Sequence, residues 1–428
     1  MWLLDKMLRA LVRTGRLTVT DHDGKVYRYG PGTEGGGGEE IAIRLTDAGA
    51  AMHIARDPRV GAGEAYMDGR LVIEPPHDVR DFVLFAMGQA QRRPGAIDAR
   101  GPLRKLADRI AGRIDQINPR AKASANVVHH YDLNRQFYEL FLDEDRQYTM
   151  AYFRDPANTL ERAQVDKKAL IAAKLRLEPG KCEGMRLLDI GCGWGGLGLY
   201  LNRHFGIEVL GVSLAPDQVR FANERAEAAG VAGKVQFRLM DYRDVDGTFD
   251  RITSVGMIEH VGAPHFPEYF GKTNRLLADD GIMLTHTIGR VGPPGSTDKW
   301  TRKYIFPGGY IPAMSELVTA LEQTGWEIAD IEVLRYHYAL TLAEWYRRTT
   351  MHRDEIVALY DERLFRMWQF YLAGAEQSFR YGGMVNFQIQ SVKRRSAVPM
   401  TRDYMADEAA RLRKAEPVPE WHLSQAAE

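Results

Sequence analysis

The feature that most constrains this chain is a buried strand that runs through a glycine-rich turn into a helix. The sequence LLDIGCGWGG occupies residues 187–196, and an apolar helical pattern follows it. Glycines at such a turn let the backbone approach a ligand closely and expose amide donors at the start of the helix. The pattern predicts a nucleotide-type binding site at the end of the strand.

From Met185 onward, strand-like apolar runs alternate with helical patterns. Repeated β–α units predict a parallel, doubly wound sheet whose ligands bind at the carboxyl ends of the strands. An aromatic and methionine-rich segment, 340–381, is expected to be a helical insertion that covers the cleft. The expected strands are Arg186–Ile190, Ile207–Ser213, Val235–Leu239, Arg251–Val255, Gly281–Thr287, Ile328–Leu334 and Val385–Gln390, and the expected helices include Leu197–Phe205, Pro216–Ala229 and Phe266–Leu277.

The glycine turn also fits the G-x-G-x-x-G pattern of dinucleotide sites. Such a site normally has an acidic residue about 20 residues further on, at the end of the second strand. Here the second expected strand ends in Ser213, and Glu208 lies at the opposite end of it. The pattern therefore fits NAD poorly.

Two acidic residues favour S-adenosylmethionine instead. Asp189 precedes the turn, where it can hold the loop and face a positively charged ligand. Asp241 follows the third expected strand, beside Tyr242, and can accept a hydrogen bond from an adenine amino group. Ser213 places a hydroxyl at the ribose position. The spacing predicts S-adenosylmethionine as the methyl donor.

The first part of the chain is expected to form a small α+β domain. Its elements are a helix over 2–12, strand-like runs over Leu17–Tyr29 and Ile41–Leu45, and a helix around Asp81–Ala90. The four glycines between the two runs predict a long hairpin loop.

A basic helical pattern at 103–117 separates this domain from the rest. It is interpreted either as a solvated linker helix or as an amphipathic helix that meets anionic lipid headgroups. The boundary is placed near Asn118-Pro119. The expected division is 1–118 for the accessory domain, 119–400 for the catalytic domain and 401–428 for a tail.

Composition excludes several classes of protein. Lys+Arg and Asp+Glu both total 57, so no basic excess exists for binding nucleic acid through the overall field. The two cysteines, Cys182 and Cys192, are too few for a disulfide framework and suit a reducing cytoplasm. No H-E-x-x-H motif occurs, and no metal is expected. No run reaches the roughly 18 charge-free apolar residues that span a bilayer, so membrane contact is expected only at the surface.

Further motifs accompany the glycine turn across residues 127–390. They are HYDL at 130–133, QY at 147–148 with AYF at 151–153, SVGMIEHVG at 254–262, HTIG at 286–289, KYIFPGG at 303–309 and HY at 337–338. In this order they resemble the cyclopropane-fatty-acyl-phospholipid synthases and the related mycolic-acid cyclopropane synthases. The N-terminal part resembles the lipid-proximal domain of the bacterial phospholipid enzymes.

The resemblance implies transfer of a methylene group from S-adenosylmethionine to the cis double bond of an acyl chain in an unsaturated phospholipid. It implies a class I methyltransferase fold, Rossmann-like, with a mostly parallel seven-stranded sheet. The donor-site positions that carry over are Tyr148, Thr149, Gly191, Gly193, Gly195, Ser213, Gln218, Asp241 and Tyr242.

The family also holds a bicarbonate ion beside the sulfonium methyl group. Its ligands map onto Glu259, His286, Tyr338 and the backbone of Ile288. A bicarbonate base on the new methyl group needs both donors and acceptors around it. His286 and Tyr338 can donate, and Glu259 can accept. These three residues are the predicted catalytic set.

One position departs from the family. A Ser-Cys pair usually follows Gln-Tyr, and the cysteine adjoins the bicarbonate, whereas this sequence has Thr149-Met150. If the contact runs through the backbone amide, Met150 preserves it and the ring closes. If the thiol or its small volume matters, the product is a methylene- or methyl-branched alkene.

Aromatic faces can stabilise the alkyl cation that methyl transfer creates, because they do not trap it covalently. Tyr131, Tyr148, Tyr371 and Phe379 match family positions near the reacting centre. For Tyr371 and Phe379, packing in a helical core is an equal interpretation.

Two other classes of function are alternatives to a lipid-modifying enzyme. A binding protein without catalysis is disfavoured by the complete acid–base set. A methyltransferase for small polar molecules or nucleic acid is disfavoured by the apolar cover at 345–379. We expect a cytoplasmic protein peripherally associated with the inner membrane face, and the resemblance is compatible with a homodimer.

Overall fold

The computed structural model describes residues 1–32, 39–92 and 133–416. The chain divides into two compact units, each described by itself. The first comprises Met1–Gly112, Thr297–Pro307 and Leu342–Gly383, and the second comprises Arg113–Ser296, Gly308–Thr341 and Met384–Glu428. The expected basic helix at 103–117 and the expected boundary near residue 118 lie outside the described residues.

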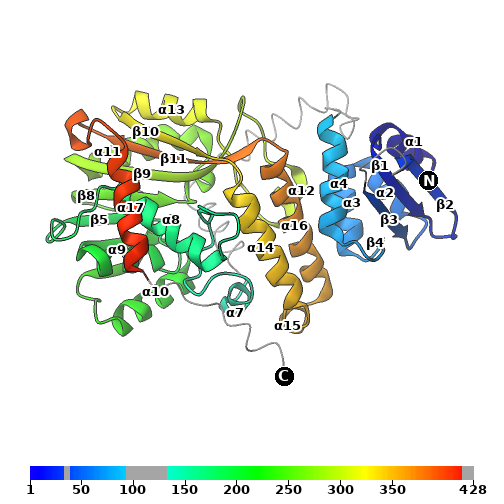
Figure 1. The fold of residues 1–428 in the computed structure, drawn as a ribbon, viewed down its shortest axis with the longest axis horizontal. Helices are drawn as coiled ribbons and strands as arrows, with labels where there is room; N and C mark the ends of the chain where they lie inside the picture. Colours follow the sequence, from blue (N-terminus) through cyan, green and yellow to red (C-terminus); the bar gives the residue numbers. More distant parts are fainter. Residues whose placement is uncertain (33–38, 93–132, 417–428) are drawn as a thin grey trace. The chain divides into compact units, whose positions relative to one another are not determined.

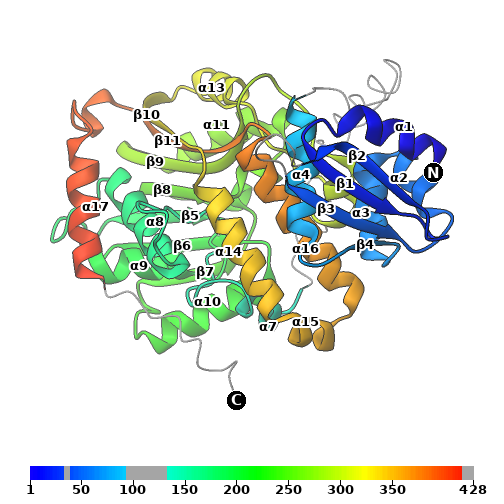
Figure 2. The same cartoon turned by 45° about the vertical axis from the view of Figure 1, so that its right-hand side comes forward.

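The second unit is built on a seven-stranded sheet of order β10-β11-β9-β8-β5-β6-β7 (Figures 1 and 2). Strands β9, β8, β5, β6 and β7 run parallel, and β11 is antiparallel to both β9 and β10. The strands are β5 Arg186–Ile190, β6 Glu208–Ser213, β7 Val235–Leu239, β8 Phe249–Val255, β9 Leu277–Arg290, β10 Glu327–Leu334 and β11 Met384–Val392. All seven predicted strands are confirmed, as is the mostly parallel sheet.

Helices cover both faces of this sheet, as a doubly wound fold requires. One face packs against α8 (Leu160–Lys174), α9 (Gly196–Phe205), α10 (Pro216–Ala228) and α17 (Asp403–Ala415). Figure 2 shows α17 and α8 side by side on that face. The other face packs against α11 (Phe266–Leu276) and α13 (Met314–Gln323). The short helix α7 (Arg135–Glu139) precedes α8 in the chain.

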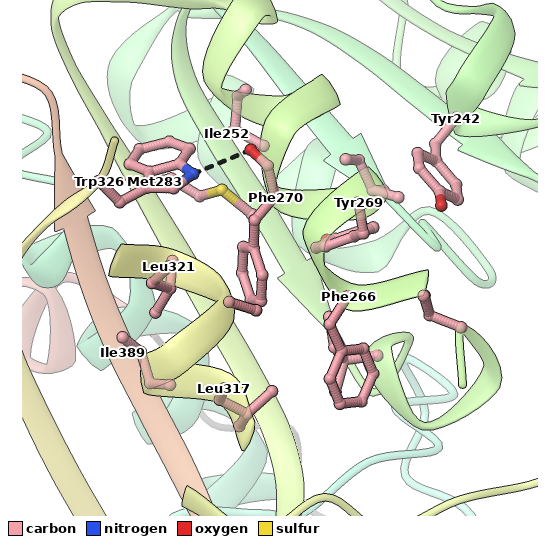
Figure 3. Close-up of a cluster of buried hydrophobic side chains, with 14 of the residues drawn as sticks. Tyr242, Ile252, Phe266, Tyr269, Phe270, Met283, Leu317, Leu321, Trp326 and Ile389 are labelled. Atoms are coloured by element: carbon pink, nitrogen blue, oxygen red, sulfur yellow. Dashed lines mark hydrogen bonds between the residues drawn. The ribbon is translucent and has the colours of Figure 1, made fainter. Parts of the chain in front are cut away.

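The apolar core between α11, α13 and the sheet fixes the strand ends that carry the candidate site (Figure 3). Phe270 and Met283 are fully buried there. The indole Nε1 of Trp326 donates a hydrogen bond to the carbonyl oxygen of Phe270 at 2.9 Å. This bond satisfies the one polar atom that a buried tryptophan brings into the core.

The first unit contains a four-stranded sheet of order β2-β1-β3-β4. Its elements are α1 Trp2–Leu11, β1 Gly15–Thr20, β2 Val26–Gly32, β3 Glu40–Leu45, α2 Ala50–Arg56, α3 Pro58–Met67, β4 Leu71–Ile73 and α4 Val79–Arg92. The predicted hairpin between 17–29 and 41–45 is wrong. Asp21 and Gly24, with a φ of +82° at the glycine, close a tight turn inside the first run. The run therefore forms the β1–β2 hairpin, and β3 pairs with β1 in parallel.

The predicted helical insertion is confirmed between β10 and β11. It consists of α14 (His337–Met351), α15 (Arg353–Leu359) and α16 (Glu362–Arg380). From Leu342 onward the insertion belongs to the first unit, which also contains α12 (Lys299–Tyr304). The fully buried carboxylate of Glu376 on α16 accepts from Arg80 of α4 at 2.6 and 2.8 Å and from Arg380 at 2.6 Å. This paired charge links the insertion to the N-terminal segment.

Among the described residues, no helix is both long and apolar enough to cross a membrane.

The Trp326 bond gives a stability prediction. Trp326→Phe should lower the free energy of unfolding by roughly 1–3 kcal/mol, because the buried Phe270 carbonyl loses its donor. Trp2→Phe, at a side chain that is 76% exposed, should change it by less than about 0.5 kcal/mol. Urea unfolding followed by circular dichroism measures both, and equal stability of the two variants would contradict the role of the bond.

Candidate active site

The glycine loop after β5 has the conformation that the sequence predicts. Gly191 and Gly195 have φ values of +82° and +81°, in the left-handed region that favours glycine. A Cβ atom at Gly195 would lie 2.8 Å from both the Cβ of Ala222 and the Cζ of Phe237. The loop is therefore packed too closely for a side chain there, and α9 starts directly after it, which leaves its first amides to face a ligand.

Asp189 lies near the end of β5, immediately before this loop, and is 2% exposed. Burial raises the pKa of its carboxyl to about 7. A cationic ligand beside it would favour the charged form and offset part of that burial cost. The residue thus suits a ligand that carries positive charge.

Two further residues that are predicted to contact the methyl donor lie at the ends of neighbouring strands. Ser213 ends β6, and its Oγ accepts from the Ala215 amide at 3.2 Å. Asp241 follows β7 and accepts from Arg243 through Nε at 2.9 Å and Nη2 at 2.6 Å. Since β5, β6 and β7 are parallel neighbours, the structure brings Asp189, Ser213 and Asp241 to one edge of the sheet.

Gln218 and Tyr242, which are also predicted to contact the methyl donor, are both buried. Gln218 on α10 is 5% exposed. Tyr242 packs edge-on against Tyr269 with ring centroids 5.1 Å apart, within the apolar core (Figure 3). For Tyr242 the structure therefore shows a packing role.

A charge cluster that the sequence analysis missed ties the segment before Tyr148 to the glycine loop. Arg225 on α10 donates to the carbonyl oxygen of Trp194 at 2.9 Å and pairs with Asp145. Lys168 on α8 donates to the other oxygen of Asp145 at 2.7 Å. Burial alone would raise the pKa of Asp145, but Lys168 and Arg225 hold it well below its usual range. The paired carboxylate thus anchors both segments.

Helix α8 also fixes the backbone of residues 147–150. Lys167 donates to Gln147 Oε1 at 2.8 Å and to Thr149 Oγ1 at 2.7 Å. Gln164 Nε2 donates to the carbonyl oxygens of the same two residues at 3.1 and 3.0 Å. Tyr148 packs edge-on against aromatic rings of α7 and the residues after it, and Met150 is fully buried. The polar partners lie far away in sequence, so no local pattern could have revealed them.

Glu259 lies just after β8, in a short 3₁₀ turn, and is 7% exposed. Its Oε1 accepts a hydrogen bond from the Ile288 amide at 2.6 Å. Its Oε2 is buried and has no hydrogen-bond partner among the described residues. Burial raises the pKa of Glu259 to about 7, partly opposed by the Ile288 amide.

His286 lies on β9, two residues before Ile288 on the same face of the strand. Gln388 Nε2 lies 3.1 Å from His286 Nδ1, whereas His286 Nε2 is buried without a partner in the described part of the chain. Burial, with contributions from Lys167, Lys174 and His337, lowers the pKa of His286 to about 3. The imidazole is therefore neutral.

The two unpartnered atoms form the main chemical feature of the site. Buried polar atoms nearly always have hydrogen-bond partners, so exceptions need an explanation. Ile288 connects the two residues: its amide donates to Glu259, and it lies two residues after His286 on β9. A carboxyl oxygen and an imidazole nitrogen left open together fit a small polar ligand that both donates and accepts.

The remaining predicted residues differ in what the structure shows. Tyr338 is 7% exposed at the start of α14. Its neighbour His337 accepts from the Phe153 amide at 3.1 Å, which fixes this turn to the segment after Met150. Tyr131 lies outside the described residues.

Tyr371 and Phe379 belong to α16 in the first unit. The ring of Tyr371 packs against Trp368 at 5.2 Å and Phe306 at 5.8 Å. Within that unit both residues are buried, as the packing interpretation expects.

The doubly wound sheet, the glycine loop and the acidic residues at the strand ends define an S-adenosylmethionine-dependent methyltransferase of class I. A family model described as Mycolic acid cyclopropane synthetase matches residues 118–389, and the chain belongs to this family. The resemblance found in the sequence motifs is thereby confirmed.

Individual relatives support the same assignment. The chain is 34% identical to a "Probable fatty acid methyltransferase" of Pseudomonas putida over 87% of this chain and 90% of the relative. It is 36% identical to the "Cyclopropane-fatty-acyl-phospholipid synthase" of Escherichia coli K12 over 79% and 84% of the two chains. Among solved structures, the mycolic acid cyclopropane synthase CmaA1 in complex with SAH and CTAB is 31% identical, with a TM-score of 0.59, over 64% of this chain and 99% of that one.

The raised pKa of Glu259 gives a prediction for stability against pH. The folded protein keeps this proton up to about pH 7, while an unfolded Glu releases it near 4.5. Stability therefore falls as pH rises from 4.5 to 7, and the loss persists above 7. Glu259→Gln mimics the protonated carboxyl and should stabilise the ligand-free protein by about 3 kcal/mol at pH 8.

The gain from Glu259→Gln should fall below about 0.5 kcal/mol at pH 4.5, where the folded carboxyl is protonated and the unfolded one is half protonated. Glu322→Gln, at an exposed position of α13, serves as the control and should show no gain at either pH. Urea unfolding at the two pH values measures the difference. A gain that is independent of pH would show that Glu259 is ionised in the folded protein.

Proposed function

We propose that this methyltransferase transfers a methylene group from S-adenosylmethionine to the cis double bond of unsaturated phospholipid acyl chains and forms cyclopropane fatty acids. The observation that carries the proposal is the pair of buried, unpartnered atoms, Glu259 Oε2 and His286 Nε2. They lie at the edge of the sheet where the glycine loop and Asp189 lie. The cyclopropane synthases among the relatives support the reaction type.

The glycine loop and the acidic strand ends are the proposed donor site. Asp189 would face the positive charge of the donor, and Asp241 would accept from the adenine. Tyr148, Thr149, Ser213, Gln218 and Tyr242 complete the proposed contacts. The Arg225–Asp145 pair and Lys167 support this site by holding the Gln147–Met150 segment in place.

An alkene attacks the methyl carbon of the donor, and a carbon–sulfur bond breaks as a carbon–carbon bond forms. The positive charge moves to the second alkene carbon. A buried setting serves this step because water would trap the cation, whereas a ring face stabilises it by about 2 kcal/mol or more. Ring closure then requires loss of one proton from the new methyl group.

Bicarbonate, when bound, supplies the base for that proton. Its proposed ligands are Glu259, His286, Tyr338, the backbone of Ile288 and the backbone at Met150. Glu259 and His286 offer it an open carboxyl oxygen and an open imidazole nitrogen, both buried. Because Glu259 titrates near neutral pH, it can either donate to the ion or accept from it.

Contact with a membrane surface is part of the proposal. In the first unit, Trp2 is 76% exposed, and Leu3 is exposed beside it. Lys6 and Arg9 are exposed on the same helix. An apolar tip next to basic residues suits an anionic lipid surface.

The test is a product analysis. Purified enzyme, S-adenosylmethionine, bicarbonate and vesicles of an unsaturated phospholipid should yield acyl chains heavier by one CH₂ group that resist hydrogenation. Mass spectrometry before and after catalytic hydrogenation measures this. A heavier chain that still takes up hydrogen would contradict ring formation, and no heavier chain at all would contradict the lipid substrate.

A second candidate product is a methylene- or methyl-branched chain. Met150 favours it, because a large buried thioether stands where the family usually has cysteine. The relative named as a fatty acid methyltransferase is consistent with it. In that case the cation loses its proton from a neighbouring carbon, and no ring forms.

Met150→Cys separates the two products. If Met150 disturbs the ion site, the substitution should raise the ratio of cyclopropane to branched product several-fold. Met351→Cys, at an exposed methionine, is the control and should leave the ratio unchanged. An unchanged ratio in Met150→Cys would show that the family contact runs through the backbone.

A further inference from the structure

We infer that Gln388 is a positioning residue that holds His286 as the tautomer with its proton on Nε2. The inference rests on the proposed function, because it assigns a role within the same ion site. The experiments below measure the histidine tautomer and ligand binding, not product formation. The role of Gln388 and the proposed reaction can therefore be disproved separately.

The geometry of the sheet places the two side chains together. His286 on β9 and Gln388 on β11 are directly opposite partners in the antiparallel register, and the two strands lie side by side in Figures 1 and 2. Directly opposite residues point to the same face of a sheet. Gln388 is fully buried and His286 is 2% exposed, so water does not compete for their bond.

This bond determines where the imidazole carries its hydrogen. Gln388 donates an amide N–H to His286 Nδ1 over 3.1 Å. A neutral imidazole has one N–H and one bare nitrogen, and the nitrogen that accepts must be the bare one. The proton of His286 therefore lies on Nε2, the atom that has no partner among the described residues.

The ring cannot escape this choice by taking a second proton. It is buried, and any positive charge on the nearby Lys167, Lys174 and His337 opposes a further one on the imidazole. Carboxyls on packed elements do not reverse this, since Glu259 itself holds its proton up to about pH 7. The imidazole of His286 therefore carries a single N–H proton, and the bond from Gln388 to Nδ1 places that proton on Nε2.

A fixed Nε2–H has a chemical consequence. It offers the site a hydrogen-bond donor and no proton acceptor at that atom. His286 then suits binding of an oxyanion, and it does not serve as the base that deprotonates the methyl group. The proton must go to the bound ion, which Glu259 can contact with its open oxygen.

Among the described residues the Gln388 amide bonds to His286, and its Oε1 is buried without a partner. Glu332 on β10 is its direct partner on the other side and pairs with the buried Lys174 at 2.5 Å. Gln390, the next residue of β11 on that face, donates to the Lys174 carbonyl and to Tyr404 Oη. Gln390 is thus a matched control: a buried glutamine on the same strand that does not contact His286.

The first experiment measures the tautomer by NMR of the full-length protein labelled with ¹⁵N-histidine. Comparison with His286→Asn assigns the signal. Wild type and Gln390→Leu should show a protonated Nε2 and a bare Nδ1. Gln388→Leu should show a mixture of the two tautomers. Gln388→Glu should place the proton on Nδ1, because a carboxylate only accepts.

The second experiment measures binding with ¹³C-bicarbonate in the presence of S-adenosylhomocysteine. Gln388→Leu should weaken bicarbonate binding about 10-fold, the scale seen for groups that orient a ligating histidine. The affinity for S-adenosylhomocysteine should stay within twofold of wild type. Gln390→Leu should leave both affinities unchanged.

A wild-type His286 protonated on Nδ1 would overturn the inference, and so would an unchanged tautomer in both Gln388 variants. If one variant fails to fold, the other and the wild type still decide the point. Failure of the proposed function looks different. In that case the wild type would show the Nε2 proton but would form no heavier acyl chain.

Discussion

Exclusion of water from the carboxyl edge of the sheet is the constraint on which the rest of the structure depends. Asp189, Glu259 and His286 are all nearly fully buried, and each has its pKa moved toward the neutral form. In the proposed reaction the site shelters an alkyl cation, and such a site cannot leave charged, hydrated side chains beside it. It can keep polar groups that are neutral until a ligand brings charge. Asp189 and Glu259 meet this requirement as buried acids with raised pKa values, and His286 meets it as a neutral imidazole.

Neutral but unpartnered groups cost stability, and the surrounding structure has to hold them rigidly. It does so with charges that are paired. Asp145 is shared between Arg225 and Lys168, and Lys174 bonds to Glu332. Full pairing distinguishes these supporting charges from the groups of the site, which face a ligand. The fold therefore combines satisfied ion pairs as support with open atoms on Glu259 and His286 that can meet a ligand.

The sequence predicted those parts of the fold that local patterns encode. The strands from Arg186 to Val392 are apolar runs, and the glycine loop needs φ values that glycine favours, so both were visible. The β1–β2 hairpin was missed although its turn, Asp21 to Gly24, contains an Asp-Gly pair that favours a hairpin, because the four glycines further on suggested a different turn. Gln388 and Arg225 were missed for another reason. Their partners lie 102 and 31 residues away, and only the sheet register and helix packing bring them together.

In the proposed reaction, the choice between a ring and a branched chain depends on which proton leaves the cation. Hydrogens on the carbons beside the cation are the more acidic ones, because their C–H bonds overlap with the empty orbital, whereas the new methyl group lies one carbon further away. Intrinsic acidity therefore does not select the methyl proton that ring closure requires. Position does. The proposed base, if held by Glu259 and by a donor at His286 Nε2, would reach only the protons that face it. Met150, fully buried next to Ala151, whose amide donates to Thr341 at 3.0 Å, lies in a backbone segment that is fixed at both ends. In the proposed mechanism the side-chain volume of Met150, rather than movement of the backbone, is therefore the variable that would shift the base from one proton to another.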